Sequence, residues 1–479
     1  MASDVQHRIN RLSGFIIFLF VLLIGWQSYW QLYKSDWLMA QPTNRRTSRA
    51  EVKTPRGVIF DRHDTRLAWS AEGKREYTDP RATAAVLGYL DPVYGRVGVE
   101  GDWDLELAGL SQKFTPQDLQ RILKDEQPRG NDLALTLDLR LQQAALRALG
   151  SHKGAVVALD PTTGGILAMA TSPTFDTSRL RQDYPTWSKS DDGVLRNRAT
   201  QDLYPPGSTM KVVTAAAALM NGVSENTRYT CHGKTKLGST TIVDYHGEVH
   251  GNIAMTKALA QSCNYYFART ATELGQEKFF ATAEAFGFNQ RWWTKLPDPR
   301  MLPLEVTEST VAKNLKRRLP LGEFAQMGFG QATVVATPLQ IAMVASAIAN
   351  GGTLMAPYLV SEVRKGGTKE VLKKFDSVQI GYPMDALHAE KLTDMMRRVV
   401  TSGTGTSANV SGVTVYGKTG TAQQNGGDDH AWFMGFGEIK HGAKSQRIAF
   451  AVVIERGGTG GRIAAPVARD VLKAWRDEH

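Results

Sequence analysis

One uncharged apolar run near the N-terminus constrains this chain more than any other feature. The run covers residues 12–30 and reads LSGFIIFLFVLLIGWQSYW. A helix of this length and composition matches the hydrocarbon thickness of a bilayer. Arg8 and Arg11 precede it, so the positive-inside rule predicts a cytoplasmic N-terminus. We therefore expect a cytoplasmic tail over residues 1–11, a membrane anchor over residues 12–32, and the rest of the chain outside the cytoplasm.

A cleaved signal peptide is the alternative to an anchor. Cleavage requires small residues after the apolar run, whereas Trp26, Tyr29 and Trp30 are bulky and Ala40 offers a weak site. We therefore expect an uncleaved single-pass anchor. Because ATP is absent outside the cytoplasm and the chain has no Walker-type loop, the chemistry should need no nucleotide.

Charge and cysteine content exclude several kinds of protein. The formal net charge is +10 and the sequence pI is about 9.4, which suits an anionic partner or reflects a solvated surface rich in lysine. There is no dense basic tract with interleaved aromatics, so we expect no nucleic-acid partner. Cys231 and Cys263 form one disulfide or remain free thiols. Their spacing is not that of a zinc motif, so we expect no metal and no cofactor.

The segment after the anchor predicts a small membrane-proximal domain. A polar, basic stalk covers residues 41–49. Residues 58–60 then form a short strand, His63 and Asp64 make a turn, and a second strand follows. The pattern stays broken by Gly, Pro and Asp for some distance. We expect an irregular, strand-rich pedestal domain over residues 33–132.

The sequence pattern changes after that domain, where longer helices and strands are expected. Asp138 and Gly150 predict the start and stop of a helix. The strands GAVVALD and ILAMATS flank a PTTGG turn, and VTVYGK, HAWFMGF and IAFAVVIE are late strands. Helical stretches lie between them, around residues 208–221 and 256–274, and an amphipathic helix ends the chain. This order predicts an α+β domain over residues 133–479, with one antiparallel sheet built from both ends of the segment.

The first motif with chemical meaning reads YPPGSTMKVV. Its Pro-Pro-Gly run cannot propagate a helix, so Ser208 should lie at a helix N-terminus. Lys211, three residues later, lies on the same helical face. A serine hydroxyl needs an adjacent base, and burial favours the neutral amine that would serve. An ordinary N-cap serine beside a solvated lysine is the alternative, because Ser-x-x-Lys alone is common.

The second motif is QSCNYYF. The hydroxyl of Ser262 is a candidate proton relay between a nucleophile and a leaving group. The amide of Asn264 is a candidate hydrogen-bonding group for a substrate amide. Taken alone, the motif is equally typical of a polar helix cap, and Cys263 receives no role.

The third motif, VTVYGKTGTAQ, alternates as a strand does. Gly420 would let another backbone or a substrate approach closely. Lys418, Thr419 and Thr421 offer one charge and two hydroxyls, which together suit a carboxylate. The backbone N–H groups of Thr421 and Ser208 would form an oxyanion hole.

In this order the three motifs match the Ser-x-x-Lys, Ser-x-Asn and Lys-Thr-Gly signature of penicillin-binding proteins and class A β-lactamases. The chain resembles class B penicillin-binding proteins from about residue 50 onward. The resemblance is carried also by RGVIFDR, GAVVALDPTTGGILAMATSPTFD and GQATVVATPLQIAMVASAIANGG. It implies a serine β-lactamase/transpeptidase-like fold and a monofunctional peptidoglycan D,D-transpeptidase.

The resemblance also implies a role for each motif. Ser208 attacks the carbonyl of the penultimate D-alanine of a stem peptide, and Lys211 accepts its proton. Terminal D-alanine leaves with help from Ser262, and an amine of a neighbouring stem completes the cross-link. β-Lactam antibiotics mimic the D-Ala-D-Ala end and acylate the same serine. The implied substrate-binding residues are Asn264, Lys418, Thr419, Gly420 and Thr421.

The domain layout carries an implication for partners. Residues 33–132 are too few for a glycan-polymerising domain, so the resemblance implies a separate glycosyltransferase of the SEDS (RodA-like) type. The stretch DDHAWFMGF is similar to elongation-type rather than division-type members. The expected location is a bacterial inner or cell membrane, with the catalytic domain periplasmic or extracellular.

Three other functions remain open. A D,D-carboxypeptidase would use water as the acceptor and yield a trimmed stem. A β-lactamase would need a base that deacylates the enzyme, and no clear Glu-x-x-x-Asn element lies between Asn264 and Lys418. A catalytically idle cell-wall scaffold would be expected to lack Ser208 or Lys211, and both are present.

Overall fold

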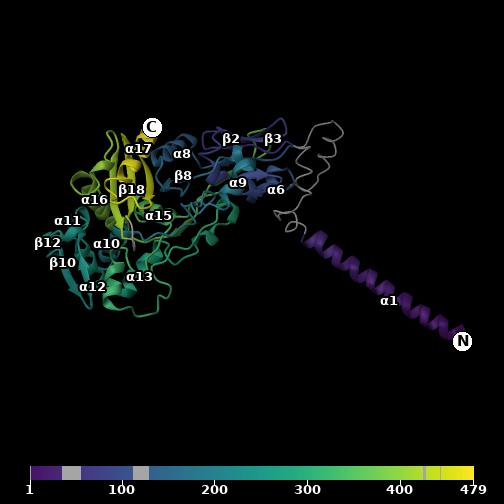
Figure 1. Ribbon diagram of the computed structural model, residues 1–479, viewed down its shortest axis with the longest axis horizontal. Coiled ribbons are helices and arrows are strands. Elements are labelled where there is room, and N and C mark those ends of the chain that lie inside the picture. Colours follow the sequence, from purple (N-terminus) through teal and green to yellow (C-terminus); the bar gives the residue numbers. More distant parts are fainter. Residues whose placement is uncertain (1, 35–54, 112–128, 424–427, 443, 479) are drawn as a thin grey trace.

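The computed structural model describes residues 2–34, 55–111, 129–423, 428–442 and 444–478. Helix α1 (Ala2–Ser28) continues into a short π-helix, η1 (Tyr29–Tyr33), and stands apart as a rod (Figure 1). Within it, Asn10–Ser28 has a mean hydropathy of 1.7 and is not buried. By length and composition this stretch could cross a membrane. The predicted stalk at residues 41–49 lies outside the described residues.

The six-stranded sheet contains strands from two distant parts of the chain. Its order is β15-β14-β6-β1-β2-β3, and the predicted strand, turn and strand are present as β1 and β2. Strand β6 pairs parallel with β1 and antiparallel with β14, so the sheet draws strands from both sides of residue 133. The bounds are β1 Ile59–Phe60, β2 Arg66–Ala71, β3 Lys74–Tyr77, β6 Asp132–Leu135, β14 Val360–Arg364 and β15 Val371–Lys374.

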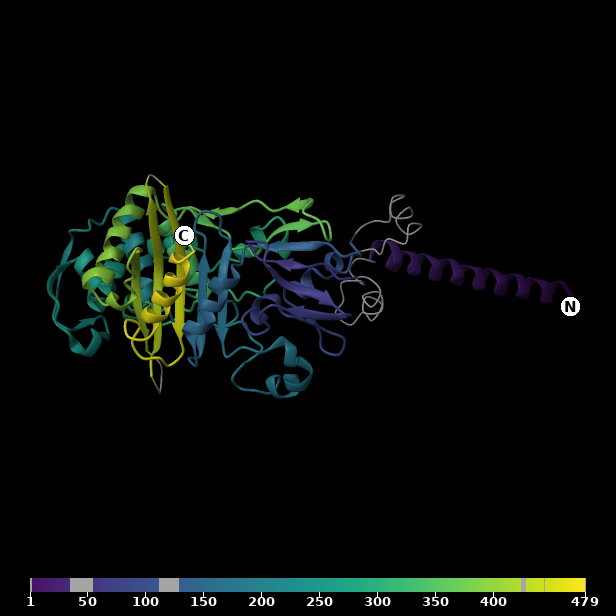
Figure 2. The ribbon, with the colours of Figure 1, turned by 90° about the horizontal axis from the view of Figure 1, so that it is seen from above.

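Short elements complete this part, which we call the pedestal. Figure 2 shows its strands between α1 and the main sheet. The indole of Trp103 is fully buried, and its ring lies 5.8 Å from that of Phe375, a residue just after β15. This contact joins the early and late segments in one core. The short elements are α4 Ala84–Leu87, β4 Tyr89–Asp91, β5 Gly95–Val97, α5 Val99–Asp102 and α6 Asp104–Leu107.

The main sheet confirms the expected α+β architecture. It is five-stranded and antiparallel in the order β17-β18-β19-β7-β8, so its strands come from the beginning and the end of the segment after residue 133. Residues of the early β7 pair directly with those of the late β19, from Leu159 opposite Ala449 to Gly154 opposite Ile454. The bounds are β7 Gly154–Leu159, β8 Ile166–Ser172, β17 Thr414–Ala422, β18 His430–His441 and β19 Lys444–Ile454.

Helices cover both faces of this sheet. Alternate side chains of β7 enter different cores: Val157 packs into the larger core and Val156 into the smaller one, as the two-residue period of a strand requires. Because both of its faces are buried, the inner strand β7 is apolar throughout. The smaller core lies under α8 and α17, and the larger core contains α10 and α15 (Figure 1). The bounds are α8 Leu139–Leu149, α10 Met210–Met220, α15 Pro338–Ala349, α16 Ala386–Ser402 and α17 Ala464–Arg476.

Local signals fix several helix ends. Asp138 caps α8 by accepting hydrogen bonds from two backbone N–H groups, and Gly150 follows its end, as the sequence predicts. Helix α10 begins after a short 3-10 turn, η3 (Gly207–Thr209). Nine of its residues after Met210 are buried, Lys211 among them. The serine motif therefore rests on a helix in the centre of the domain.

The sequence-based prediction of one helical stretch over 256–274 is wrong. The chain forms α11 (Met255–Ala260) and α12 (Asn264–Leu274), because Ser262 has a φ of +59°, which a right-handed helix does not accommodate. The Cys263 side chain then caps α12. The break places Ser262 in a turn between α11 and α12. Around it lie β9 Arg228–Cys231, β10 Lys234–Leu237, β11 Thr240–Val243, η4 Tyr245–Gly247 and β12 Gly251–Ala254.

The remaining elements connect these parts. They are η2 Thr177–Arg179, α9 Leu180–Trp187, α13 Gln276–Ala285, η5 Trp292–Lys295, η6 Pro299–Met301, α14 Leu321–Met327, β13 Leu354–Met355, β16 Gln379–Gly381 and η7 Thr406–Ala408.

Candidate active site

The three sequence motifs line one cavity. Its volume is about 790 Å³, which is within the range of small-molecule sites. Ser208 from η3, Ser262 and Asn264 from the break between α11 and α12, and Thr419 and Thr421 from β17 all face it. Residues far apart in sequence therefore meet at the sheet edge formed by β17.

Glycines bring the Ser208 turn against strand β17. Gly207 has a φ of +53°, and a Cβ at this position would lie 2.7 Å from the carbonyl oxygen of Thr421. A Cβ at Gly420 would lie 2.8 Å from the Cβ of Trp432 and 3.0 Å from the Thr209 methyl. The close approach expected at Gly420 is thus made by the protein itself, and it places Ser208 beside the Lys-Thr-Gly strand.

Hydrogen bonds to neutral oxygens hold Lys211, and among the described residues no carboxylate forms an ion pair with it. Its side chain is fully buried, and Nζ donates to the Ser262 carbonyl oxygen at 2.5 Å, the Ser262 Oγ at 3.1 Å and the Asn264 Oδ1 at 2.7 Å. Burial lowers the pKa of Lys211 to about 8, against a smaller opposing effect of Cys263 and Asp244. Roughly a tenth of such amines are neutral at pH 7. The amine is therefore suited to accept a proton.

Lys418 lies on the other side of Ser262. It is also fully buried, and its Nζ donates to the Ser262 Oγ at 2.9 Å and to the Thr419 carbonyl oxygen at 2.9 Å. Burial, and then the charge of Lys211, hold the pKa of Lys418 well below its usual value. The hydroxyl of Ser262 thus accepts from two buried amines. This arrangement can move a proton between them.

Two hydroxyls meet at the Thr419 end of the cavity. The Oγ1 atoms of Thr404 and Thr419 are 2.6 Å apart, and Thr404 also lines the cavity. Sequence reasoning missed Thr404. It lies in the SGTGT segment after α16, a run of small hydroxyl and glycine residues that was the available signal.

The amide of Asn264 is engaged by the protein. Its Oδ1 accepts from Lys211, and its Nδ2 donates to the Val243 carbonyl oxygen at 2.9 Å. Its backbone N–H donates to the Asp244 carboxylate in a short hydrogen bond. Asn264 therefore links the buried lysine to the β11 strand, in addition to facing the cavity.

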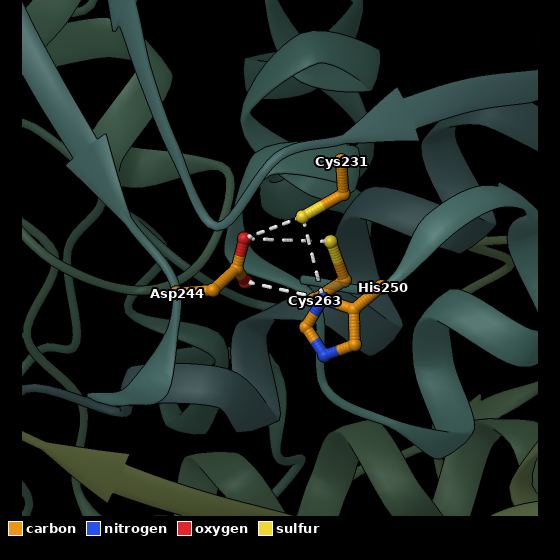
Figure 3. A group of neighbouring side chains, drawn as sticks. All are labelled: Cys231, Asp244, His250 and Cys263. Carbon is orange, nitrogen blue, oxygen red and sulfur yellow. Dashed lines mark hydrogen bonds and ion pairs between the residues drawn. The ribbon is translucent and has the colours of Figure 1, made fainter. Parts of the chain in front are cut away.

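Four potential metal ligands, one of them next to Ser262 in sequence, lie close together (Figure 3). Both cysteines are free thiols, and burial raises the pKa of each. Sequence reasoning missed this cluster because its members are 13, 6 and 13 residues apart, which is not the spacing of a zinc motif. The fold brings one ligand atom of each within 4.8 Å of the others. We call these residues the Cys–His–Asp cluster: Cys231, Asp244, His250 and Cys263.

Comparison with protein families yields two matches. Residues 154–473 match the penicillin binding protein transpeptidase domain. Residues 56–133 match the penicillin binding protein A dimerisation domain. The first match covers more than half of the chain and contains all three motifs.

Relatives of known name match nearly the whole chain. It is 34% identical to the peptidoglycan D,D-transpeptidase PbpA of Mycolicibacterium smegmatis, over 97% of this chain and 98% of that protein. It is 31% identical to the peptidoglycan D,D-transpeptidase MrdA of Acinetobacter baumannii, over 80% of this chain and 60% of that protein.

Solved structures share the fold. An imipenem acyl-enzyme complex of penicillin-binding protein A from M. tuberculosis superposes with a TM-score of 0.79 at 30% identity, over 88% of this chain and 99% of that one. The ceftriaxone acyl-enzyme complex of the same protein gives a TM-score of 0.79 at 31% identity, with the same coverage.

Proposed function

This chain belongs to the penicillin-binding protein transpeptidase family, and from that premise we propose that it is a serine-type peptidoglycan D,D-transpeptidase. The relatives named above carry that activity in their names. The class B, elongation-type assignment expected from the sequence agrees with them. Acyl-enzyme complexes of its structural neighbours with imipenem and ceftriaxone support β-lactams as inhibitors that acylate the same serine.

The first half of the reaction acylates Ser208. Its Oγ attacks the carbonyl carbon of the penultimate D-alanine, and the neutral fraction of Lys211 takes the hydroxyl proton. The developing oxyanion accepts hydrogen bonds from the backbone N–H groups of Ser208 and Thr421. The position of Ser208 against β17 supports this pairing, since Gly207 and Gly420 allow the two backbones to approach.

Proton delivery to the leaving group follows through Ser262. The peptide C–N bond breaks, and the amine of terminal D-alanine takes a proton relayed from Lys211 by the Ser262 hydroxyl. Lys418, Thr419 and Thr421 hold the carboxylate of the leaving residue. Asn264 positions Lys211 and offers its remaining amide N–H to the substrate.

The second half of the reaction forms the cross-link. The amine of a neighbouring stem attacks the Ser208 ester and loses a proton through the same relay, and a new peptide bond forms as Ser208 leaves. Water in place of the amine would give a D,D-carboxypeptidase. The two reactions share every group of the chain named so far, and they differ in product.

A single observation carries this proposal: the Ser262 hydroxyl accepts hydrogen bonds from two fully buried lysines in the cavity that Ser208 lines. The test is to give the full chain, in detergent, uncross-linked glycan strands that carry pentapeptide stems. We expect dimeric stems and free D-alanine, both absent with Ser208→Ala. Trimmed monomers alone would indicate a carboxypeptidase. A folded protein that releases no D-alanine would indicate a scaffold.

We also propose the layout expected from the sequence. Residues 12–32 anchor the chain with residues 1–11 in the cytoplasm, residues 33–132 form the pedestal domain and residues 133–479 the transpeptidase domain. The apolar α1 supports the anchor. A SEDS-type glycosyltransferase would supply the glycan strands and contact the anchor and pedestal. Protease added to intact spheroplasts should degrade the catalytic domain and spare a tag on residue 1.

A further inference from the structure

Apart from two histidines, the charged residues that line the active-site cavity are mostly acidic. Asp244, Glu248 and Asp429 contribute carboxyl groups. Among the residues that the structure describes, Arg462 is the one lysine or arginine in the lining. The stem peptide ends in a carboxylate, which these acidic groups would repel. A positive charge that faces the cavity is therefore needed where the terminal residue binds.

Lys418 does not line the cavity itself. Its side chain is fully buried, and the cavity is lined instead by its neighbour Thr419. The Lys418 amine donates to the Ser262 hydroxyl at 2.9 Å and to the Thr419 carbonyl oxygen at 2.9 Å. It also lies 3.4 Å from the Thr419 hydroxyl. Lys418 can therefore orient that hydroxyl, while the cavity receives a hydroxyl group from this part of β17 and not the amine.

The turn that carries Arg462 is packed against the same end of the cavity. A Cβ at Gly461 would lie 3.7 Å from the Thr419 methyl group and would collide with the Thr404 carbonyl oxygen. The backbone N–H of Arg462 donates to the Thr459 carbonyl oxygen at 3.2 Å, and α17 begins two residues later. The backbone of Arg462 is therefore fixed close to Thr419, whose hydroxyl is expected to meet the substrate carboxylate.

The guanidinium of Arg462 is available to a ligand. Arg462 is exposed, and among the described residues its side chain forms no ion pair or hydrogen bond. By contrast, Arg469 and Arg476 of α17 pair with their neighbours Asp470 and Asp477 at 3.0 Å and 2.6 Å. A guanidinium presents donors in a planar fork that matches the two oxygens of a carboxylate. Arg462 therefore faces the cavity with these donors unused.

We propose that Arg462 binds the terminal carboxylate of the stem peptide and makes the enzyme specific for a free carboxylate at that end. This assignment rests on the transpeptidase function proposed above and adds a charge to the hydroxyls of Thr419 and Thr421. The hydroxyls orient the carboxylate, and the guanidinium offsets the repulsion from the acidic groups of the cavity. A β-lactam with a free carboxylate binds through the same group.

Acylation of the full chain, in detergent, by benzylpenicillin and by its methyl ester tests this role. Arg462→Gln should slow acylation by the free acid roughly tenfold, as expected for the loss of a charge-assisted hydrogen bond. The rate with the ester should stay nearly unchanged, and Arg462→Lys should keep most of the rate with the acid. Arg456→Gln removes the same charge from an exposed arginine outside the cavity lining and should change neither rate. Added salt should slow the reaction of the unmodified protein with the acid but not with the ester.

The ratio of the two rates separates binding of the carboxylate from an effect on the fold. If Arg462→Gln slows the acid and the ester equally, or slows neither, the proposal is wrong. An equal loss in Arg456→Gln would also overturn it. If Arg462→Gln does not fold, the unmodified protein decides, because a rate with the acid that salt does not change would contradict the role of a charge. A folded, unmodified chain that neither compound acylates would overturn the proposed function itself, and this assignment with it.

Discussion

The pedestal and the active site both bury cationic side chains, but they neutralise them differently. In the pedestal, Arg56 is 4% exposed and pairs with Glu100 at 2.9 Å and Asp104 at 2.7 Å. In the active site, Lys211 and Lys418 are fully buried. Their hydrogen bonds go to hydroxyl, carbonyl and amide oxygens. Among the described residues, no carboxylate forms an ion pair with either lysine.

This difference separates charges that hold structure from charges that react. In the pedestal, burial alone would raise the pKa of Glu100, but the charges of Arg75 and Arg56 outweigh it and lower that pKa. Glu100 therefore stays ionised. In the active site burial outweighs the opposing effects of Cys263 and Asp244, so the pKa of Lys211 falls to about 8. A pKa shifted toward neutral pH, as that of Lys211 is, allows a group to exchange protons there.

Removing the Lys211 amine should give the largest effect on activity. Lys211→Met should slow β-lactam acylation by roughly 10²–10⁴-fold, as expected for loss of a general base. It should not lower the melting temperature, because a buried charge without an ionic partner is removed. Stopped-flow acylation and thermal unfolding measure the two quantities. Lys257→Met, at an exposed position on α11, is the control. If Lys211→Met is acylated as fast as the unmodified protein, Lys211 is not the general base.

In the pedestal we expect a loss of stability without a loss of activity. Arg56→Met leaves Glu100 and Asp104 without one of their partners, so it should lower the free energy of unfolding by about 3–5 kcal/mol. The folded fraction should still be acylated at the normal rate. Urea unfolding measures the change in stability. Arg66→Met, at an exposed position of β2, is the control. Equal stability of the two variants would mean that the pedestal cluster is not structural.

The rate of acylation should depend on pH through the amine of Lys211. Because the neutral amine is the active form and the pKa of Lys211 is lowered to about 8, the rate should rise with pH. The neutral fraction grows about tenfold between pH 7 and pH 9. Single-turnover acylation across this range measures it. A rate that falls or stays flat through pH 8 would contradict the assignment of the base.

The smallest effect is expected where the pedestal contacts η6. Arg300 lies 4.4 Å over the Trp103 ring and pairs with Asp298 at 3.0 Å. Because Arg300 is partly exposed, Arg300→Ala should lower the free energy of unfolding by only about 1–2 kcal/mol and leave acylation unchanged. Arg291→Ala, whose side chain is 73% exposed, should change stability by less than about 0.5 kcal/mol. Denaturant titration measures the free energy of unfolding of both variants. A larger loss in Arg291→Ala than in Arg300→Ala would contradict the prediction.

Sequence reasoning worked where the signal was local. Short apolar runs predicted the strands of the main sheet, Asp138 and Gly150 predicted the ends of α8, and the Pro-Pro-Gly run predicted that Ser208 lies at a helix start. These features depend on neighbours along the chain. The cavity they form together could be anticipated only from the family resemblance.

Features that depend on long-range packing were not predictable from the chain alone. Strands β14 and β15 join the pedestal sheet far from its other strands in sequence. The helix break at Ser262 requires a positive φ in a residue type that gives no warning of it. The Cys–His–Asp cluster forms because three strand ends and a helix start converge, and no spacing rule describes that.

The central claim is that Ser208 is acylated beside two buried lysines, neither of which forms an ion pair with a carboxylate among the described residues. The most direct test is to incubate the full chain and its Ser208→Ala variant with a fluorescent penicillin and map the labelled peptide. We predict one covalent label, on Ser208, that is absent in the variant. A label on another residue, or equal labelling of both folded proteins, would contradict the account.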